Sequence, residues 1–171
     1  IEDGTIDSLG RTASGRKEVV RAALDEWEAV AQLTFIEVPF NNPGVTNYII
    51  FKDHPSKNNS NVGKWPFQAS QNINITSWGF PQTKGVIIHE VGHALGLYHE
   101  QNRSDRDTYV TIVEANVAPE SLFNFDLITT DNVGTYDFES IMHYSRKAFS
   151  VNNQDTIVMN AGFEAFQNVI G

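Results

Sequence analysis

The stretch that decides the fold is residues 89–99, which read His-Glu-Val-Gly-His-Ala-Leu-Gly-Leu-Tyr-His. Two histidines four residues apart stand one turn above each other on the same face of a helix. His89 and His93 can therefore share one metal ion. Glu90 lies beside them, where its carboxylate can reach a water bound to that metal.

Gly96 follows at the point where this helix is expected to end. Glycine readily adopts the left-handed conformation that turns the chain back after a helix. Such a turn would bring His99 round as a third nitrogen ligand beside His89 and His93. Three protein ligands and a water are typical of a catalytic zinc site, whereas structural zinc sites have four protein ligands. The pattern predicts a zinc-dependent hydrolase with one Zn²⁺ per chain.

A second interpretation is a packed helix whose histidines are ordinary core residues. Seven apolar side chains in this region favour packing: Val86, Ile87, Ile88, Val91, Ala94, Leu95 and Leu97. A helix that only packs has no need of three histidines and a glutamate within eleven residues. The extended motif rarely occurs without zinc, so we favour the metal site.

Composition excludes several classes of protein. The chain of 171 residues can form one compact domain or two lobes that share a cleft. The net charge of −9 argues against a nucleic-acid partner and suits a soluble exported enzyme. No run of about 18 apolar residues suggests a membrane span. The absence of cysteine excludes a disulfide scaffold.

Apolar periodicity predicts an order of helices and strands. Helical spacing predicts a long helix over residues 14–32, and a second helix carries the histidines. Alternation or short apolar runs predict strands at residues 33–38, 48–51, 62–65 and 72–76. Residues 1–99 are thus expected to form a lobe of mixed, twisted sheet and two long helices. Residues 100–171 read as a more irregular lobe, and a substrate cleft is expected between the lobes.

Residues 140–144, Ser-Ile-Met-His-Tyr, form the second segment with chemical meaning. A zinc helix followed by a methionine turn points to the metzincin peptidases. Residues 99–110, 124–126 and 136–144 match more closely, and here the chain resembles the astacin family. The resemblance extends from the first helix to Phe149. It implies an α+β fold of the metzincin type, formed by residues 1–171 as a single peptidase domain.

The same resemblance assigns further roles. It places Met142 in the tight turn beneath the metal and makes Tyr144 a phenol that binds zinc at rest and stabilises the oxyanion during the reaction. His143 is not expected to bind zinc, because three histidines already suffice. Most astacins contain cysteines, whereas this chain has none, so it resembles a divergent member of the family.

These residues predict a secreted zinc endopeptidase that hydrolyses extended protein or peptide substrates. Glu90 would act as general base on a zinc-activated water. An extended peptide would bind along an exposed strand edge, for which the resemblance favours Val62, Gly63, Lys64 and Trp65. An N-terminal propeptide is a candidate inhibitor. The alternative is a binding or adhesion module that retains zinc without catalysis, but Glu90 and all three histidines are intact.

Overall fold

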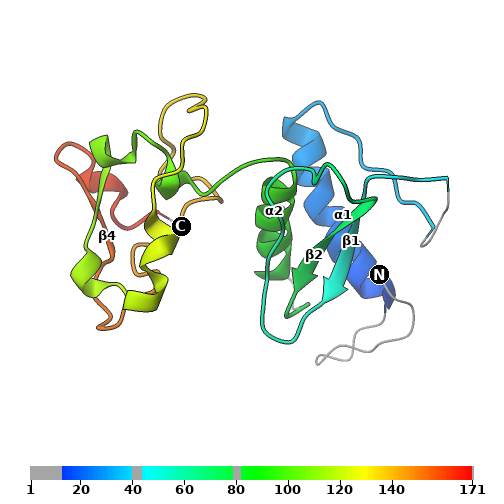
Figure 1. Ribbon diagram of the computed structural model, residues 1–171, viewed down its shortest axis with the longest axis horizontal. Coiled ribbons are helices and arrows are strands. Elements are labelled where there is room, and N and C mark those ends of the chain that lie inside the picture. Colours follow the sequence, from blue (N-terminus) through cyan, green and yellow to red (C-terminus); the bar gives the residue numbers. More distant parts are fainter. Residues whose placement is uncertain (1–12, 40–43, 79–81, 171) are drawn as a thin grey trace. The chain divides into compact units, whose positions relative to one another are not determined.

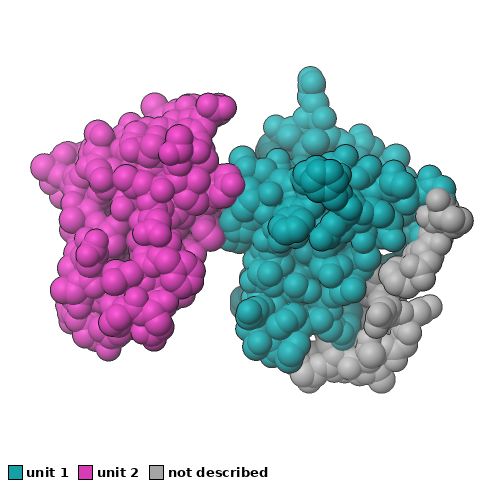
Figure 2. Space-filling model, viewed as in Figure 1, with its two compact units in different colours: residues 1–97 teal, residues 98–171 magenta. Residues whose placement is uncertain are grey.

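Two units make up the chain, and this computed structural model describes residues 13–39, 44–78 and 82–170. Residues 1–97 form one unit and residues 98–171 the other (Figure 2). The regular elements of the first unit are α1 (Ala13–Val30), β1 (Tyr48–Asp53), β2 (Ser70–Ile75) and α2 (Gln82–Ala94) (Figure 1). This mixture of helix and strand confirms the predicted α+β class. The cleft expected between two lobes stays a prediction.

One hydrophobic core holds the first unit together. On α1, Val19, Val20 and Ala23 are buried at helical spacing. Their partners in the core are Ile73, Ile75, Trp78, Ile87 and Val91, from β2, α2 and the residues between them. The indole Nε1–H of Trp27 on α1 donates a 3.0 Å hydrogen bond to the Ile88 carbonyl of α2. The helix that carries two of the histidines is therefore fixed against α1 and the sheet.

The sheet of this unit contains two parallel strands, with Tyr48 of β1 beside Ser70 of β2 and Asp53 beside Ile75. Alternate β2 side chains are buried, as expected for a strand with one face on a core. Both strands were predicted, and the structure extends each of them by two residues at one end. An isolated antiparallel bridge joins Asn59 to Asn74 at the other edge of β2.

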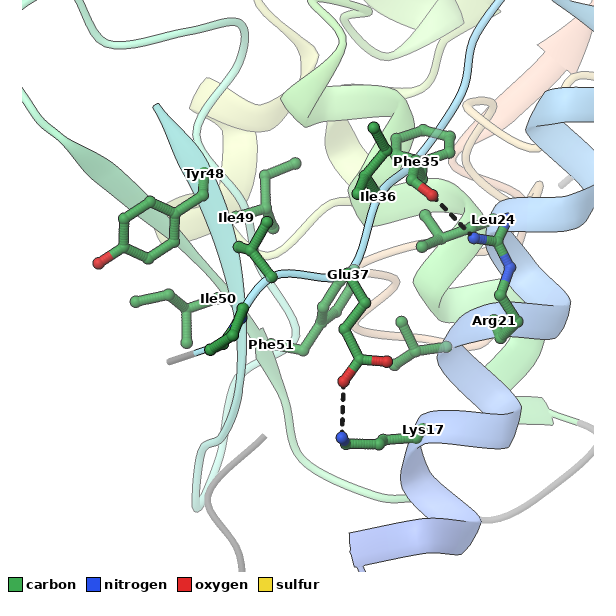
Figure 3. A pocket seen from close by; sticks show the side chains of 13 residues that line it. Lys17, Arg21, Leu24, Phe35, Ile36, Glu37, Tyr48, Ile49, Ile50 and Phe51 are labelled. Carbon is green, nitrogen blue, oxygen red and sulfur yellow. Dashed lines mark hydrogen bonds and ion pairs between the residues drawn. The ribbon is translucent and has the colours of Figure 1, made fainter. Parts of the chain in front are cut away.

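The strand predicted at residues 33–38 is wrong. In the described part of the chain these residues join no sheet. Side chains of α1 bind their backbone instead: Glu28 accepts a 2.6 Å hydrogen bond from the Phe35 N–H, and Arg21 donates one of 3.2 Å to the Phe35 carbonyl. A hollow of about 750 Å³ is lined by this segment, α1 and β1, and the Lys17–Glu37 ion pair joins the segment to α1 beside it (Figure 3).

The second unit has little regular structure, as predicted for the C-terminal lobe. Its strands β3 (Val110–Ile112) and β4 (Ile157–Met159) pair antiparallel. Five short 3₁₀ helices accompany them: η1 (Glu100–Asn102), η2 (Arg106–Thr108), η3 (Glu114–Asn116), η4 (Pro119–Phe125) and η5 (Glu164–Phe166). Aromatic side chains supply much of the core, with Tyr109 stacked on Tyr136 at 4.8 Å. Among the described residues, no helix has the length and apolar character needed to cross a lipid bilayer.

Ile87→Ala should lower the free energy of unfolding of the first unit by about 2–5 kcal/mol, because the Ile87 side chain is 0% exposed and its loss leaves a cavity. Ile36 is 78% exposed, so Ile36→Ala is the matched control and should change stability by about 0.5 kcal/mol or less. Urea unfolding followed by tryptophan fluorescence reports on this unit, since all three tryptophans lie within it. Equal destabilisation by both variants would contradict the assigned core.

Candidate metal centre

Three imidazoles come together at the C-terminal end of α2. The rings of His89 and His93 lie 4.7 Å apart, nearly perpendicular to each other. The ligand atoms of His89, His93 and His99 all lie within 4.8 Å of one another. Imidazole nitrogens suit zinc, whereas calcium takes oxygen ligands. The three residues predicted as metal ligands thus form one group whose donor atoms fit a zinc ion.

A left-handed turn ends α2 and leads to the third histidine. Gly96 has a φ of 108°, a conformation that residues with a Cβ rarely adopt. Its N–H donates a 2.8 Å hydrogen bond to the His93 carbonyl, and the Leu97 N–H donates one of 3.0 Å to the Gly92 carbonyl. Such bonds satisfy carbonyls that a helix end otherwise leaves without partners. The glycine turn predicted from the sequence is therefore present.

The same turn sets the protonation of His93. Its Nδ1 lies 2.8 Å from the Leu97 carbonyl oxygen. A carbonyl can only accept, so Nδ1 carries the hydrogen and Nε2 keeps the lone pair that a metal requires. Burial lowers the pKa of His93, with a smaller contribution from His89, while the Leu97 carbonyl raises it. Burial thus favours the neutral imidazole, which is the form that binds metal.

Glu90 is a buried carboxylate next to His89. Its side chain is 5% exposed, and burial raises its pKa to about 7. The backbone N–H of Ser60 donates a hydrogen bond to the carboxylate, and this bond lowers the pKa by a smaller amount. Within the described residues, Glu90 Oε2 is buried with no hydrogen-bond partner. A buried, unpaired carboxylate oxygen is costly in a protein and calls for a functional explanation.

Tyr144 and Met142 lie in the second unit, close to the segment that begins with His99. The ring centroids of Tyr144 and His99 are 4.4 Å apart. Phe125 and Phe149 pack around the phenol at 5.9 and 5.5 Å. Met142 is buried, and its carbonyl accepts a 3.0 Å hydrogen bond from the N–H of Glu100. The predicted methionine turn is thus attached to the residue that follows the third histidine.

His143 has protein partners on both ring nitrogens. Nδ1 lies 2.7 Å from the Tyr144 carbonyl, to which it must donate. Nε2 then accepts from the Tyr136 hydroxyl, also at 2.7 Å. Burial lowers the pKa of His143, which favours the neutral ring that this arrangement needs. These contacts agree with the expectation that His143 does not bind the metal.

The residues predicted to bind substrate, Val62–Trp65, form bends and irregular backbone, so the strand predicted there is wrong. The physical reason is Gly63, whose φ of 68° interrupts an extended run. Its N–H donates a 2.8 Å hydrogen bond to the His93 carbonyl at the end of α2. Lys64 and Trp65 line a small hollow of about 140 Å³. Their role in substrate binding stays a prediction.

Two further residues at this centre were missed from the sequence. Ser60 supplies the backbone N–H that bonds Glu90. Gln101 binds the backbone of Tyr144. A hydrogen bond donated by a backbone N–H does not depend on the residue type. The sequence therefore carried no signal for the role of Ser60. For Gln101, its place two residues after His99 was the available signal.

Comparison with known proteins supports a common origin with zinc peptidases. The model of the peptidase family "Astacin" matches residues 8–171. The zinc metalloproteinase dpy-31 of Teladorsagia circumcincta is 36% identical over 168 residues, which are 95% of this chain and 26% of that protein. Embryonic protein UVS.2 of Xenopus laevis is 54% identical over 74 residues, 43% of this chain and 14% of that protein. The chain thus spans about a quarter or less of these relatives.

A solved structure shows the same similarity. High choriolytic enzyme 1, a hatching enzyme zinc-protease from Oryzias latipes (medaka fish), has a TM-score of 0.74 to this chain at 32% identity. The similarity covers 92% of this chain and 74% of that one.

Gly96→Ala should weaken zinc binding by about tenfold to a hundredfold, because a Cβ in a left-handed conformation costs about 1–3 kcal/mol. The metal-free chain can relieve this strain by moving the turn and His99 with it, whereas the zinc-bound chain cannot. Gly162→Ala is the matched control, since Gly162 also has a left-handed φ, 96°, and follows β4. Competition with a chromophoric chelator measures the affinity. Equal zinc affinity in Gly96→Ala and wild type would contradict the role of this turn.

Proposed function

Because the chain belongs to the astacin family of peptidases, we propose that residues 1–171 are the peptidase domain of a secreted zinc endopeptidase. The observation that carries the proposal is the group of three histidine nitrogens next to a buried glutamate with an unpaired oxygen. Secretion is proposed from the similarity to High choriolytic enzyme 1, a hatching enzyme zinc-protease of the medaka fish.

In this proposal His89, His93 and His99 hold the zinc, and Tyr144 is a fourth, displaceable ligand. Zinc held by these residues would supply a water with a pKa of about 7 and would polarise the carbonyl that is attacked. The hydrogen bond from His93 Nδ1 to Leu97 keeps that ring in the tautomer that binds through Nε2.

Glu90 is proposed as the general base and then the general acid. Its carboxylate would take a proton from the attacking water and deliver it to the leaving amine. Burial and the Ser60 N–H hold the side chain in place, and a nearby cation would lower its pKa and so favour the carboxylate that a base requires.

Tyr144 is proposed to donate a hydrogen bond from its phenol to the oxygen of the scissile carbonyl as charge develops there. Its ring lies against His99 and is packed by Phe125 and Phe149, which restricts the positions that the phenol can take. Met142, buried two residues earlier, is proposed to support the turn that carries Tyr144.

The proposed substrates are extended segments of proteins or peptides. Val62, Gly63, Lys64 and Trp65 are proposed to line the path of the substrate, which is supported by the bond between Gly63 and the His93 carbonyl. Lys64 and Trp65 also line the small hollow beside Ala94, at the end of α2. A propeptide bound along the same path would inhibit the enzyme.

Glu90→Ala should lower peptide hydrolysis by about 10²–10⁴-fold and leave about one zinc per chain, because the base is lost and the three ligands remain. Azocasein cleavage and metal analysis measure the two effects, and a chelator should abolish wild-type activity. Glu120→Gln is the matched control, since Glu120 is exposed and far from the motif in sequence. If wild type and Glu90→Ala both hold zinc and neither cleaves, the chain is a zinc-retaining binding module and not a peptidase.

Tyr144→Phe should lower kcat by about 10²–10³-fold with a much smaller change in KM, because the donor acts chiefly on the developing oxyanion. Phenylalanine keeps the ring that packs against His99, Phe125 and Phe149. A quenched fluorescent peptide gives both constants. An unchanged kcat would remove Tyr144 from the mechanism.

A further inference from the structure

The four residues after His99 bind four different parts of the second unit. Glu100 accepts a 2.9 Å hydrogen bond from the N–H of Asp137. Gln101 accepts one of 3.0 Å from the N–H of Tyr144. Asn102 donates to the carbonyls of Asn124 and Asp126, and Arg103 to those of Val133 and Gly134. This segment therefore connects His99 to the backbone of the second unit at residues 124–126, 133–134, 137 and 144.

Gln101 is the member of this segment that reaches the backbone of Tyr144. Its side chain is 0% exposed, although glutamine is mostly found on protein surfaces. Its Oε1 accepts the Tyr144 N–H, and its Nε2 donates a 3.1 Å hydrogen bond to Asn102 Oδ1. Both ends of the amide are thus used, as a buried polar group requires.

The orientation of the Gln101 amide follows from its neighbours. Asn102 must point its nitrogen at two carbonyls, those of Asn124 and Asp126, at 2.9 and 2.7 Å. The Asn102 side-chain oxygen therefore faces Gln101, which can donate a hydrogen bond to it only from its own NH₂ group. The Gln101 oxygen is consequently directed to Tyr144, whose N–H can only donate. Glutamate, which lacks the NH₂ donor, would set two oxygens against each other at Asn102.

We infer that Gln101 is a positioning residue that fixes the backbone of Tyr144 relative to His99, an inference that rests on the proposed function. The N–H of Tyr144 is held by Gln101, and its carbonyl accepts from His143 Nδ1 on the other side. Two residues before Tyr144, the Met142 carbonyl is held by the N–H of Glu100. The Tyr144 side chain can still rotate about its own bonds, whereas these hydrogen bonds fix the backbone of Tyr144.

Gln101→Met tests the inference, because methionine keeps the length of the side chain and removes both hydrogen bonds. We expect kcat to fall by about ten- to a hundredfold with KM nearly unchanged, as expected when a reacting group is misplaced. Gln167→Met is the matched control. Gln167 also binds backbone in the second unit, accepting from the Met159 N–H and donating to the Ile157 carbonyl, and its side-chain hydrogen bonds go to residues other than Tyr144.

A double-mutant cycle separates positioning from general support. If Gln101 acts through the phenol, Gln101→Met should have little further effect on kcat once Tyr144→Phe has removed the hydroxyl.

A second measurement is spectroscopic and does not require catalysis. In the protein loaded with Cu²⁺, the charge-transfer band from the Tyr144 phenolate should weaken or shift in Gln101→Met and stay unchanged in Gln167→Met.

Each outcome has one meaning. If wild type and Gln167→Met cleave, and Gln101→Met matches them in kcat and in the copper band, the inference is overturned and the peptidase proposal stands. If Gln101→Met lowers kcat equally in wild type and in Tyr144→Phe, the inference is also overturned.

If Gln101→Met does not fold, as judged by circular dichroism, Gln101→Glu takes its place. Glutamate keeps the acceptor for Tyr144 but opposes Asn102, so kcat should still fall, by less than tenfold, and unchanged kcat overturns the inference.

Discussion

At Gly96 the backbone leaves α2 in a left-handed conformation, and hydrogen bonds to the carbonyls of Gly92 and His93 hold it there. The turn brings the Leu97 carbonyl to His93 Nδ1, which fixes that ring in the tautomer suited to a metal. It also directs the chain to His99, the third predicted ligand. One backbone conformation that favours glycine therefore controls both the state of one ligand and the position of another.

Much of this could be predicted from the sequence, because the signals are local. Histidines one helical turn apart predicted α2 and the grouping of His89 and His93, and the spacing to Gly96 predicted the turn and His99. The comparisons confirm the astacin resemblance, the α+β fold and the zinc requirement. The roles of individual residues, the extent of the domain and secretion stay predictions.

The rest could not be predicted, because it depends on contacts between distant residues. Alternation suggested strands at residues 33–38 and 62–65. The first binds side chains of α1 instead, and the second is interrupted by the left-handed Gly63. The N–H of Ser60 reaches Glu90 across thirty positions, and Gln101 reaches Tyr144 across 43. Composition and periodicity carry no information about such bonds.

The second unit shows why these bonds matter. The chain has no cysteine, and this unit has short strands and short 3₁₀ helices. Its cross-links are buried polar side chains, above all Gln101, Asn102 and Arg103, each at most 9% exposed. Such bonds contribute about 0.5–1.5 kcal/mol each, and losing one partner costs more. Because this network begins directly after His99, zinc bound by His99, as proposed, would also stabilise the network. Under the proposed function, metal affinity, stability of this unit and the position of Tyr144 would therefore all depend on this one segment of chain.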